Sequence, residues 1–453
     1  RRGRPRATQP IQADCVSLLC LGAVPIALLA GGVAFGGGAT ERPLPMPKAL
    51  AAAGAAVDDR LRLRQLKDKG CGIVATRAVS RGAVLIRVPQ QAVLTGRLAK
   101  RILGPDAEAL HDDAALCALL AEARLQAERR DGLDVLGLRE YLREIPADFG
   151  SLPFWLKEEV AEQELRGTAL LPAVLAQHAR AEQDRQAAVQ ALGDKLEAVW
   201  SAKHWRWAQA ALLTRAGPGL GSEALQADEE ERGSAIVPLV DFVNCDGDPN
   251  AECQRREGCV VLVARRDLQP GEEVTISYGS QTAEQMLFTF GFCPLGARRA
   301  ATAPLPLYPP EAGPGSELRA TLLRLVALNR DDDDEASGLP AARLSWSSTS
   351  LAPQADCAEL VMAANILDLD ETALRRTAAS AAAADGVLPA SLGERPASAA
   401  ARARLLELLG AWQQELAAGP RGLHGPLRAY REECLDLARD AERRIAAARV
   451  PGA

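Results

Sequence analysis

Three separated segments of the chain carry residue types that suit close binding of a ligand. Lys69–Val74 contains two glycines separated by one residue, and glycine lets a backbone approach a ligand without an intervening side chain. Val237–Cys245 is an apolar run that ends in polar residues, and Gly271–Gly279 ends in Tyr278 and a glycine. Each pattern is weak alone, since a Gly-x-Gly usually marks only a turn. Their presence in one chain predicts a site to which all three segments contribute.

The residue types in these segments favour positioning chemistry over a strong acid or base. Glu272 and Glu273 are adjacent in a predicted strand, so their side chains point to opposite faces and do not share a proton. We interpret both as surface charges of a hairpin. The phenol of Tyr278 is neutral near pH 7, because its ordinary pKa is about 10. The histidines are widely scattered, at His111, His178, His204 and His424.

A metal centre is not expected. Ten cysteines in 453 residues are too sparse for a disulfide scaffold and favour a reducing compartment. Their closest grouping lacks the C-x₂-C pair that zinc sites usually carry, and comprises Cys245, Cys253, Cys259 and Cys293. The acidic run Asp331–Glu335 is interpreted as a solvated linker, because ligands in direct succession are not arranged around a point. Gly217–Gly221 lacks the Lys-Ser/Thr of a phosphate loop and is interpreted as a flexible loop.

Strand and helix patterns alternate up to about residue 309, which predicts an α+β fold. Strands are expected at 72–75, 83–89, 235–240, 259–264 and 274–278, the last two paired as a hairpin through Pro270-Gly271. Helical spacing of apolar residues covers 107–130, 154–185 and 200–213.

Beyond residue 309 the chain is rich in Ala, Leu and Arg, which predicts a helical structure throughout. Helices are predicted at 317–329, 358–367, 400–416 and 427–449. The Ala-rich stretch 378–384 is expected to be a surface insertion.

Composition and charge exclude several classes of protein. With 48% apolar and 25% charged residues, the chain is too apolar for wholesale disorder. The net charge is −6 and no basic stripe follows residue 6, so no nucleic-acid partner is expected. Residues 15–40 are uncharged and follow several arginines, which favours a targeting segment; a membrane anchor and a disordered leader are the alternatives. Membrane contact is expected only through that stretch.

In this order, the segments resemble the SET-domain methyltransferases, specifically the class of the plastid Rubisco large-subunit lysine methyltransferase. Glu140–Pro146, Pro153–Trp155 and Glu164–Thr168 are similar to the helical insert of that class, and Trp205–Arg215 to its next landmark. The resemblance implies a leader at 1–58, a β-rich SET domain at 59–305 with a helical insert at about 106–215, and an all-helical substrate-binding domain at 306–453. A protein substrate bound by that last domain, and a monomeric state, are expected.

The resemblance also implies a cofactor, S-adenosylmethionine, and the residues that hold it. The cofactor would be held by backbone groups of the first segment, here Lys69, Gly70 and Cys71. An arginine suited to its methionine carboxylate, here Arg215, and a polar pair, here Asn244 and Cys245, would complete the site. Tyr278 would contact the cofactor and act as the catalytic residue. The acceptor nitrogen would be guided by Thr214, Asp241 and Phe290.

Two residues depart from the pattern of the family. Cys245 stands where relatives carry histidine, and Phe290 stands where many carry the tyrosine of a Tyr-Gly-Phe motif. The missing hydroxyl at 290 bears on the degree of methylation and on the acceptor residue.

Lysine of a protein is therefore the leading predicted acceptor, with Rubisco large subunit or another protein as substrate. Histidine methylation and a catalytically silent protein-binding role are the alternatives. A plastid location fits the resemblance and the leader, with a cytoplasmic or membrane-anchored protein as the alternatives.

Overall fold

The computed structural model describes residues 41–67, 69–216, 234–279, 283–292, 303–306, 316–328, 341–346, 355–384, 387–389, 391–394, 397–418 and 425–447. Every described residue belongs to one compact unit of the chain. Several sequence interpretations fall outside the described residues: the uncharged stretch 15–40, Gly217–Gly221, Cys293 and Asp331–Glu335.

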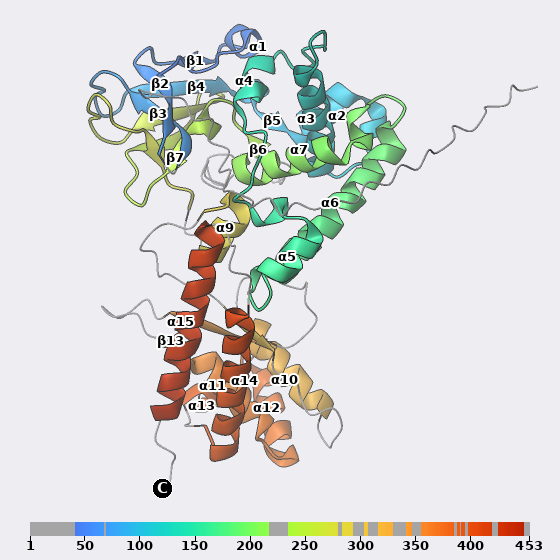
Figure 1. Cartoon of the computed structure of the whole chain (residues 1–453), viewed down its shortest axis with the longest axis vertical. Coiled ribbons are helices and arrows are strands. Elements are labelled where there is room, and N and C mark those ends of the chain that lie inside the picture. The colour runs from blue at the N-terminus through green and yellow to red at the C-terminus, as the bar shows by residue number, and fades with distance from the viewer. Residues whose placement is uncertain are drawn as a thin grey trace, which may run out of the picture. The chain divides into compact units, whose positions relative to one another are not determined.

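An antiparallel sheet forms the β-rich part of the fold (Figure 1). Its four strands, in the order β1-β4-β9-β8, are β1 (Ala56–Val57), β4 (Val84–Pro89), β9 (Cys259–Ala264) and β8 (Ala251–Arg256). Beside it, β2 (Leu61–Leu66) pairs with β3 (Gly70–Ala75). In β2 the alternation is clear, since Leu61 and Leu63 are buried while Arg62 and Arg64 are half-buried, as the period of two of a strand requires.

Two small strand pairs bring distant segments together. β7 (Asn244–Cys245) pairs in parallel with β10 (Thr275–Ile276), and β5 (Leu94–Thr95) pairs with β6 (Ala235–Ile236). The predicted hairpin between 259–264 and 274–278 is therefore wrong. Pro270-Gly271 does make a turn, as the sequence indicated. The strand after the turn, β10, pairs with β7, however, and β9 pairs with β8.

The predicted strand at 235–240 is also shorter than expected. It ends after Ile236, and a 3-10 helix, Val240–Phe242, follows a left-handed residue, Leu239, with φ 76°. This sharp turn of the backbone ends the strand although the apolar run continues.

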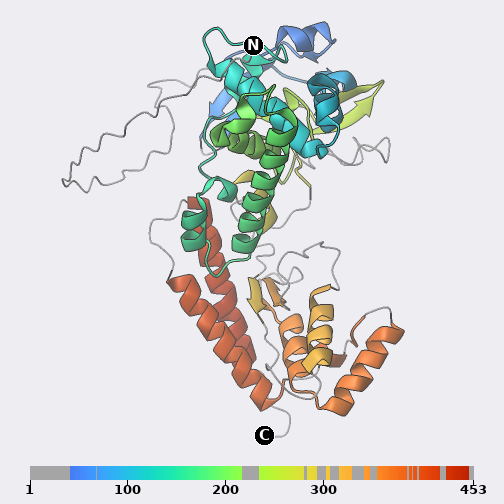
Figure 2. The ribbon, with the colours of Figure 1, turned by 90° about the vertical axis from the view of Figure 1, so that its right-hand side faces the viewer.

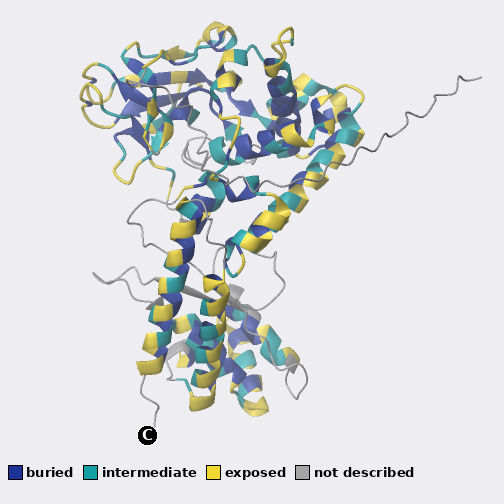
Figure 3. Ribbon diagram, in the orientation of Figure 1, coloured by how far each residue is buried: buried dark blue, intermediate teal, exposed yellow. Residues whose placement is uncertain are grey.

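The predicted helical insert is present, and it begins at residue 96 instead of about 106. Its helices are α2 (Gly96–Leu103), α3 (Asp112–Glu128), α4 (Arg139–Glu144), α5 (Glu158–Glu164), α6 (Leu170–Leu192) and α7 (Ala202–Arg215). Thr95 caps α2 through its side-chain oxygen, a start signal that an apolar pattern alone does not reveal. Helix α3 is buried continuously from Ala114 to Arg124 (Figure 3), a run that is apolar except for Glu122 and Arg124.

The expected leader boundary at residue 58 is wrong. Leu44 and Leu50 are buried in the same core as the sheet, the latter on α1 (Lys48–Ala52). The backbone of Arg42 exchanges hydrogen bonds with that of Leu63. Residues 41–57 thus belong to the folded domain, because their two leucines bury apolar surface in it.

A second hydrophobic core holds the C-terminal helices. These are α10 (Ser316–Leu328), α11 (Ala358–Leu367), α12 (Glu371–Ala383), α13 (Ser391–Glu394), α14 (Ala399–Ala417) and α15 (Gly425–Ala447). Helices α14 and α15 lie side by side (Figure 1, Figure 2). The Ala-rich stretch 378–384 is not an insertion, since most of it lies in α12 and Ala381 is buried.

The C-terminal part is predominantly helical, but it is not all-helical as expected. Three short strands form an antiparallel sheet: β11 (Ala303–Pro306), β12 (Ala341–Trp346) and β13 (Ala355–Asp356). β11 (APLP) and β13 (AD) are too short to give a strand pattern, and β12 (AARLSW) lacks the β-branched residues typical of strands.

The second core also crosses the expected domain boundary at 305. It includes Ala161, Leu165 and Leu170 of the insert, and Leu287 on α9 (Ala283–Phe290). No helix in the described part of the chain is long and apolar enough to cross a membrane.

Candidate active site

The segment from Asp241 to Cys245 is the point at which the three predicted segments meet. Parallel pairing of β7 with β10 sets Asn244 opposite Thr275 and Cys245 opposite Ile276. Two residues beyond β10, the hydroxyl of Tyr278 donates a hydrogen bond of 2.9 Å to the carbonyl oxygen of Val243. The third segment is thereby held against the second.

An ion pair with a third polar partner lies at the start of this segment. Nη1 of Arg215, the last residue of α7, lies 2.6 Å from Oδ2 of Asp241. The same oxygen accepts a hydrogen bond of 2.8 Å from the hydroxyl of Tyr141 on α4. The ring of Phe242 packs against both partners, edge to face with Tyr141 and 5.1 Å from the guanidinium carbon of Arg215.

Burial dominates the electrostatics of this pair. The side chain of Asp241 is 0% exposed and that of Arg215 is 12% exposed. Burial raises the pKa of Asp241 above its ordinary value, although Arg215 and Tyr141 act to lower it. Burial also acts against the charge on Arg215, but Asp241 outweighs that effect and the pKa of the guanidinium is raised.

Each member of the ion pair keeps one buried atom without a hydrogen bond. Oδ1 of Asp241 and Nε of Arg215 have no partner among the described residues. Such atoms are rare in folded proteins because an unsatisfied buried polar group costs about 1–3 kcal/mol. The pair therefore offers one acceptor and one donor to a ligand.

The carboxylate of Glu273, predicted from the sequence to lie on the surface, joins the first segment to the second. Oε2 of Glu273 lies 2.9 Å from Nζ of Lys69, and its Oε1 accepts a 2.8 Å hydrogen bond from Nδ2 of Asn244. The hydrogen bond that Lys69 donates to Glu273 raises the pKa of Lys69. The interpretation of Glu273 as a hairpin surface charge is wrong, because the hairpin does not form and its side chain is only 18% exposed.

The geometry favours both glycines of the first segment. Gly70 has φ 76°, in the left-handed region that favours glycine. A Cβ on Gly72 would lie 2.6 Å from Nδ2 of Asn244 and 2.5 Å from a methyl of Leu66. A side chain at residue 72 would therefore displace the ends of the Leu66 and Asn244 side chains.

One aromatic ring packs against Tyr278, and a second packs against the first. Its ring centroid lies 4.6 Å from that of Phe290, and Phe290 lies 6.1 Å from Phe292. Burial raises the pKa of Tyr278 above its ordinary value, so its hydroxyl is protonated at neutral pH.

The remaining predicted residues lie at or next to this site. Cys245 is half-buried on β7, and burial raises the pKa of its thiol, which lies against the backbone of Tyr278. Cys71 is half-buried on β3, and its Sγ lies 3.5 Å from Oε1 of Gln65. The hydroxyl of Thr214 donates to the carbonyl of Ala210 within α7.

The described residues contain no group of three or more His, Cys, Asp or Glu side chains that could hold a metal ion.

The sequence reading missed two residues of the site, Tyr141 and Glu273. Tyr141 lies within the Glu140–Pro146 stretch singled out as part of the insert, but a tyrosine beside apolar residues reads as a core residue. Glu273 was weighed only against its neighbour Glu272. Neither has a local signal, since their partners are 100 and 29 residues away in the chain, at Asp241 and Asn244.

Comparison with known proteins identifies the fold. Residues 70–279 match the family model of the SET domain. SET domain-containing protein 8 of Schizosaccharomyces pombe is 22% identical over 248 residues, which are 52% of this chain and 54% of that protein. The chain thus spans about half the length of this relative.

Solved structures extend the likeness beyond the SET domain. The SET domain of LSMT bound to lysine and AdoHcy has a TM-score of 0.59 at 15% identity, covering 88% of this chain and 89% of that chain. Rubisco LSMT bound to AdoMet has a TM-score of 0.59 at 16% identity, covering 88% and 90%. The α+β fold and the resemblance drawn from the sequence are confirmed.

Proposed function

We propose that this chain, whose residues 70–279 match the SET-domain model and which shares the fold of Rubisco LSMT, is an S-adenosylmethionine-dependent protein-lysine N-methyltransferase. One observation carries the proposal: Gly72, Arg215 and Tyr278 come from three distant parts of the sequence, and all three contact residues 241–244.

The unsatisfied atoms of the ion pair fit the amino-acid end of S-adenosylmethionine. Nε of Arg215 would donate to the carboxylate of the cofactor, and Oδ1 of Asp241 would accept from its ammonium group. Backbone groups at Gly70 and Gly72 would line the approach, since neither position carries a Cβ. When bound, the cofactor supplies a methyl group on a positively charged sulfur.

The residues of this chain then have to align the acceptor and leave it a lone pair. A lysine of pKa about 10.4 is protonated at pH 7, and deprotonating it costs roughly 4–5 kcal/mol in water. Aromatic surroundings such as those of Phe290 lower that cost by disfavouring the charged amine. The hydroxyl of Tyr278, which donates to the carbonyl of Val243 and is thereby held in place, would help to orient the amine.

Lysine is the preferred acceptor, and Phe290 supports one alternative. Solved structures of the SET domain of LSMT, which has this fold, hold lysine or methyllysine. Here Phe290 packs 4.6 Å from the ring of Tyr278 and offers no hydroxyl to the acceptor. Histidine, whose neutral ring nitrogen needs less stabilisation than a lysine amine, is the alternative acceptor.

The proposal extends to a protein substrate bound by the C-terminal helices. Their hydrophobic core includes Leu287 of α9, the helix that ends at Phe290. A monomer and a plastid location complete the proposal. Size-exclusion chromatography with light scattering and cell fractionation test these two points.

The direct test is methyl transfer from labelled S-adenosylmethionine to a protein extract, followed by mass spectrometry of the modified residue. Replacing Tyr278 with phenylalanine (Tyr278→Phe) should slow transfer at least about tenfold while cofactor affinity changes by less than about threefold. A variant that methylates as fast as the parent would show the role given to Tyr278 to be wrong. A folded parent that binds no cofactor in calorimetry would instead favour the silent protein-binding role.

A further inference from the structure

The insert places a hydroxyl group on the buried ion pair of the site. Tyr141 is 0% exposed, and its hydroxyl donates to Oδ2 of Asp241, the oxygen that also binds Arg215. A phenylalanine would fill the same space against Phe242, so packing alone does not require the hydroxyl. Its effect is to hold the carboxylate in one orientation, with Oδ1 directed away from Arg215.

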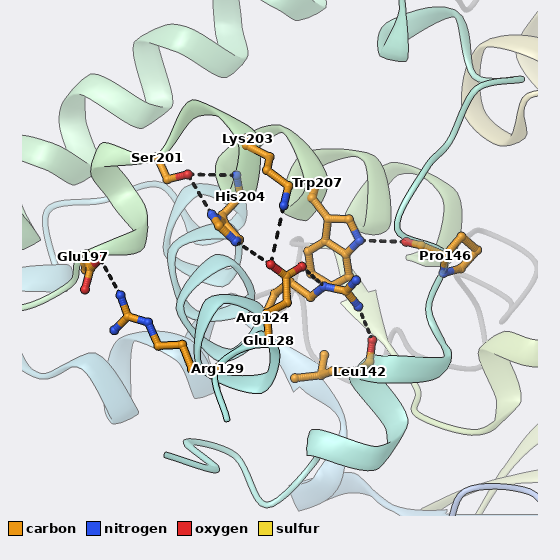
Figure 4. A network of polar contacts seen from close by, with 10 residues as sticks. All are labelled: Arg124, Glu128, Arg129, Leu142, Pro146, Glu197, Ser201, Lys203, His204 and Trp207. Atoms are coloured by element: carbon orange, nitrogen blue, oxygen red, sulfur yellow. Dashed lines mark hydrogen bonds and ion pairs between the residues drawn. The ribbon is translucent and has the colours of Figure 1, made fainter. Parts of the chain in front are cut away.

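A polar network fixes Tyr141 relative to Arg215. Figure 4 shows Arg124 of α3 between two helices of the insert: its Nη1 donates a 2.8 Å hydrogen bond to the carbonyl of Leu142, the residue after Tyr141. The guanidinium carbon of Arg124 lies 4.8 Å from the ring centroid of Trp207 on α7. Trp207 in turn donates a 2.8 Å hydrogen bond to the carbonyl of Pro146.

This network ties two residues that follow Tyr141, Leu142 and Pro146, to the helix that ends at Arg215. Leu142 is one residue away from Tyr141, and Trp207 is two helical turns before Arg215 on α7. A tyrosine and an arginine held on connected helices approach the same carboxylate oxygen with little freedom to move, which is the condition for a preorganised binding site.

Resting on the function proposed above, we propose that Tyr141 is a positioning residue that orients Asp241 and Arg215 for the amino-acid end of S-adenosylmethionine. It does not contact the reacting atoms. It acts on the cofactor through Asp241, whose Oδ1 it leaves available to the ammonium group.

The test compares two tyrosine variants in the full chain by calorimetry with S-adenosylhomocysteine. Tyr141→Phe should weaken binding about tenfold, the loss typical of a hydrogen bond to a charged group. The matched control is Tyr430→Phe: Tyr430 is equally buried and its hydroxyl lies 3.1 Å from a carboxylate, that of Glu284, in the second core. The control should keep the affinity of the parent.

The pH dependence of binding supplies a measurement that loss of stability alone would not change. Asp241 faces Arg215 and Tyr141, and the hydroxyl of Tyr278 also acts on the pair. The hydrogen bond from Tyr141 lowers the pKa of Asp241, so its loss raises that pKa further. The acid limb of the binding curve should therefore move to higher pH in Tyr141→Phe and stay in place in Tyr430→Phe.

The outcomes separate this inference from the proposed function. If the parent does not bind S-adenosylhomocysteine, both the role of Tyr141 and the proposed function are wrong. If the parent binds and Tyr141→Phe binds equally well with the same acid limb, only the role of Tyr141 falls. Should Tyr141→Phe fail to fold, 3-fluorotyrosine in place of Tyr141 keeps the ring and donates more strongly; an acid limb that does not move to lower pH would then overturn the inference.

Discussion

Two carboxylates of the same domain, Asp241 and Glu128, each bind an arginine of the insert, yet their environments differ. Asp241 is fully buried and its pKa is raised by burial. Glu128, at the end of α3, is 37% exposed (Figure 4). Burial acts to raise its pKa too, but hydrogen bonds from Arg124 and His204 outweigh burial and lower it.

The two carboxylates also differ in how their oxygens are used. Oε1 of Glu128 lies 2.9 Å from Nε of Arg124, and its Oε2 lies 3.2 Å from Nε2 of His204 and 3.5 Å from Nζ of Lys203. Both oxygens are satisfied within the protein. Asp241 keeps one oxygen without a partner among the described residues. A satisfied carboxylate near the surface fastens helices together, whereas an unsatisfied buried one is suited to a ligand.

The strongest way to break this comparison is to neutralise each carboxylate with its isosteric amide. Asp241→Asn leaves Arg215 buried without its counter-charge and should lower the free energy of unfolding by about 3–5 kcal/mol. It should also weaken S-adenosylhomocysteine binding at least about 100-fold. Glu128→Gln should cost only about 1 kcal/mol, because the carboxylate itself is 37% exposed to solvent, and should leave binding unchanged. Chemical denaturation and calorimetry measure both; equal losses of stability in the two variants would end the comparison.

An intermediate effect is expected at Glu273, which is less buried than Asp241 but more buried than Glu128. Glu273→Gln removes the charge that holds Lys69 and offers Asn244 a weaker acceptor. Cofactor affinity should fall about fivefold, since Lys69 is partly exposed and its ion pair is screened.

The matched control for that change is the neighbouring Glu272→Gln, whose ion pair with Arg266 lies outside the site. Calorimetry should show no change in cofactor affinity for this control. A similar loss of affinity in both variants would place the effect in the fold of the turn and not in the contact with Lys69 and Asn244.

The smallest effect concerns acid stability at Glu128. A carboxyl whose pKa is lower in the folded state stabilises the fold above its unfolded pKa of about 4.3, and that stability is lost as the pH falls through the folded pKa. Melting temperatures of the parent should therefore decline more steeply below about pH 5 than those of Glu128→Gln. Parallel curves for the two proteins would mean that Arg124 and His204 do not hold the Glu128 carboxylate in solution.

Residues with a local pattern were predictable. The glycine pair at 70 and 72 and four C-terminal helices follow from spacing and residue type, and the structure has α10, α11, α14 and α15 within a few residues of the expected bounds. The grouping of Arg215, Asn244 and Tyr278 around one segment was expected from the resemblance, and the contacts at residues 241–244 agree with it.

Contacts between distant residues were not predictable in this way. The strand that ends near Tyr278 was given to a hairpin with 259–264 because proline and glycine in succession favour a turn. Tertiary packing instead pairs it in parallel with β7, and parallel pairing leaves no turn signal in the sequence. Glu273 was misjudged for the same reason, since its face of the strand depends on that partner.

By itself, the sequence determined which groups the site contains: a phenol, a guanidinium, an amide and a backbone bare of side chains at two glycines. Only the tertiary structure decided how they are charged and what they face. A side chain's type fixes its donors, acceptors and ordinary pKa, but burial and the neighbours brought from 26 or 100 residues away set the environment of Asp241. That environment separates an aspartate suited to a ligand from one that would merely pair with an arginine.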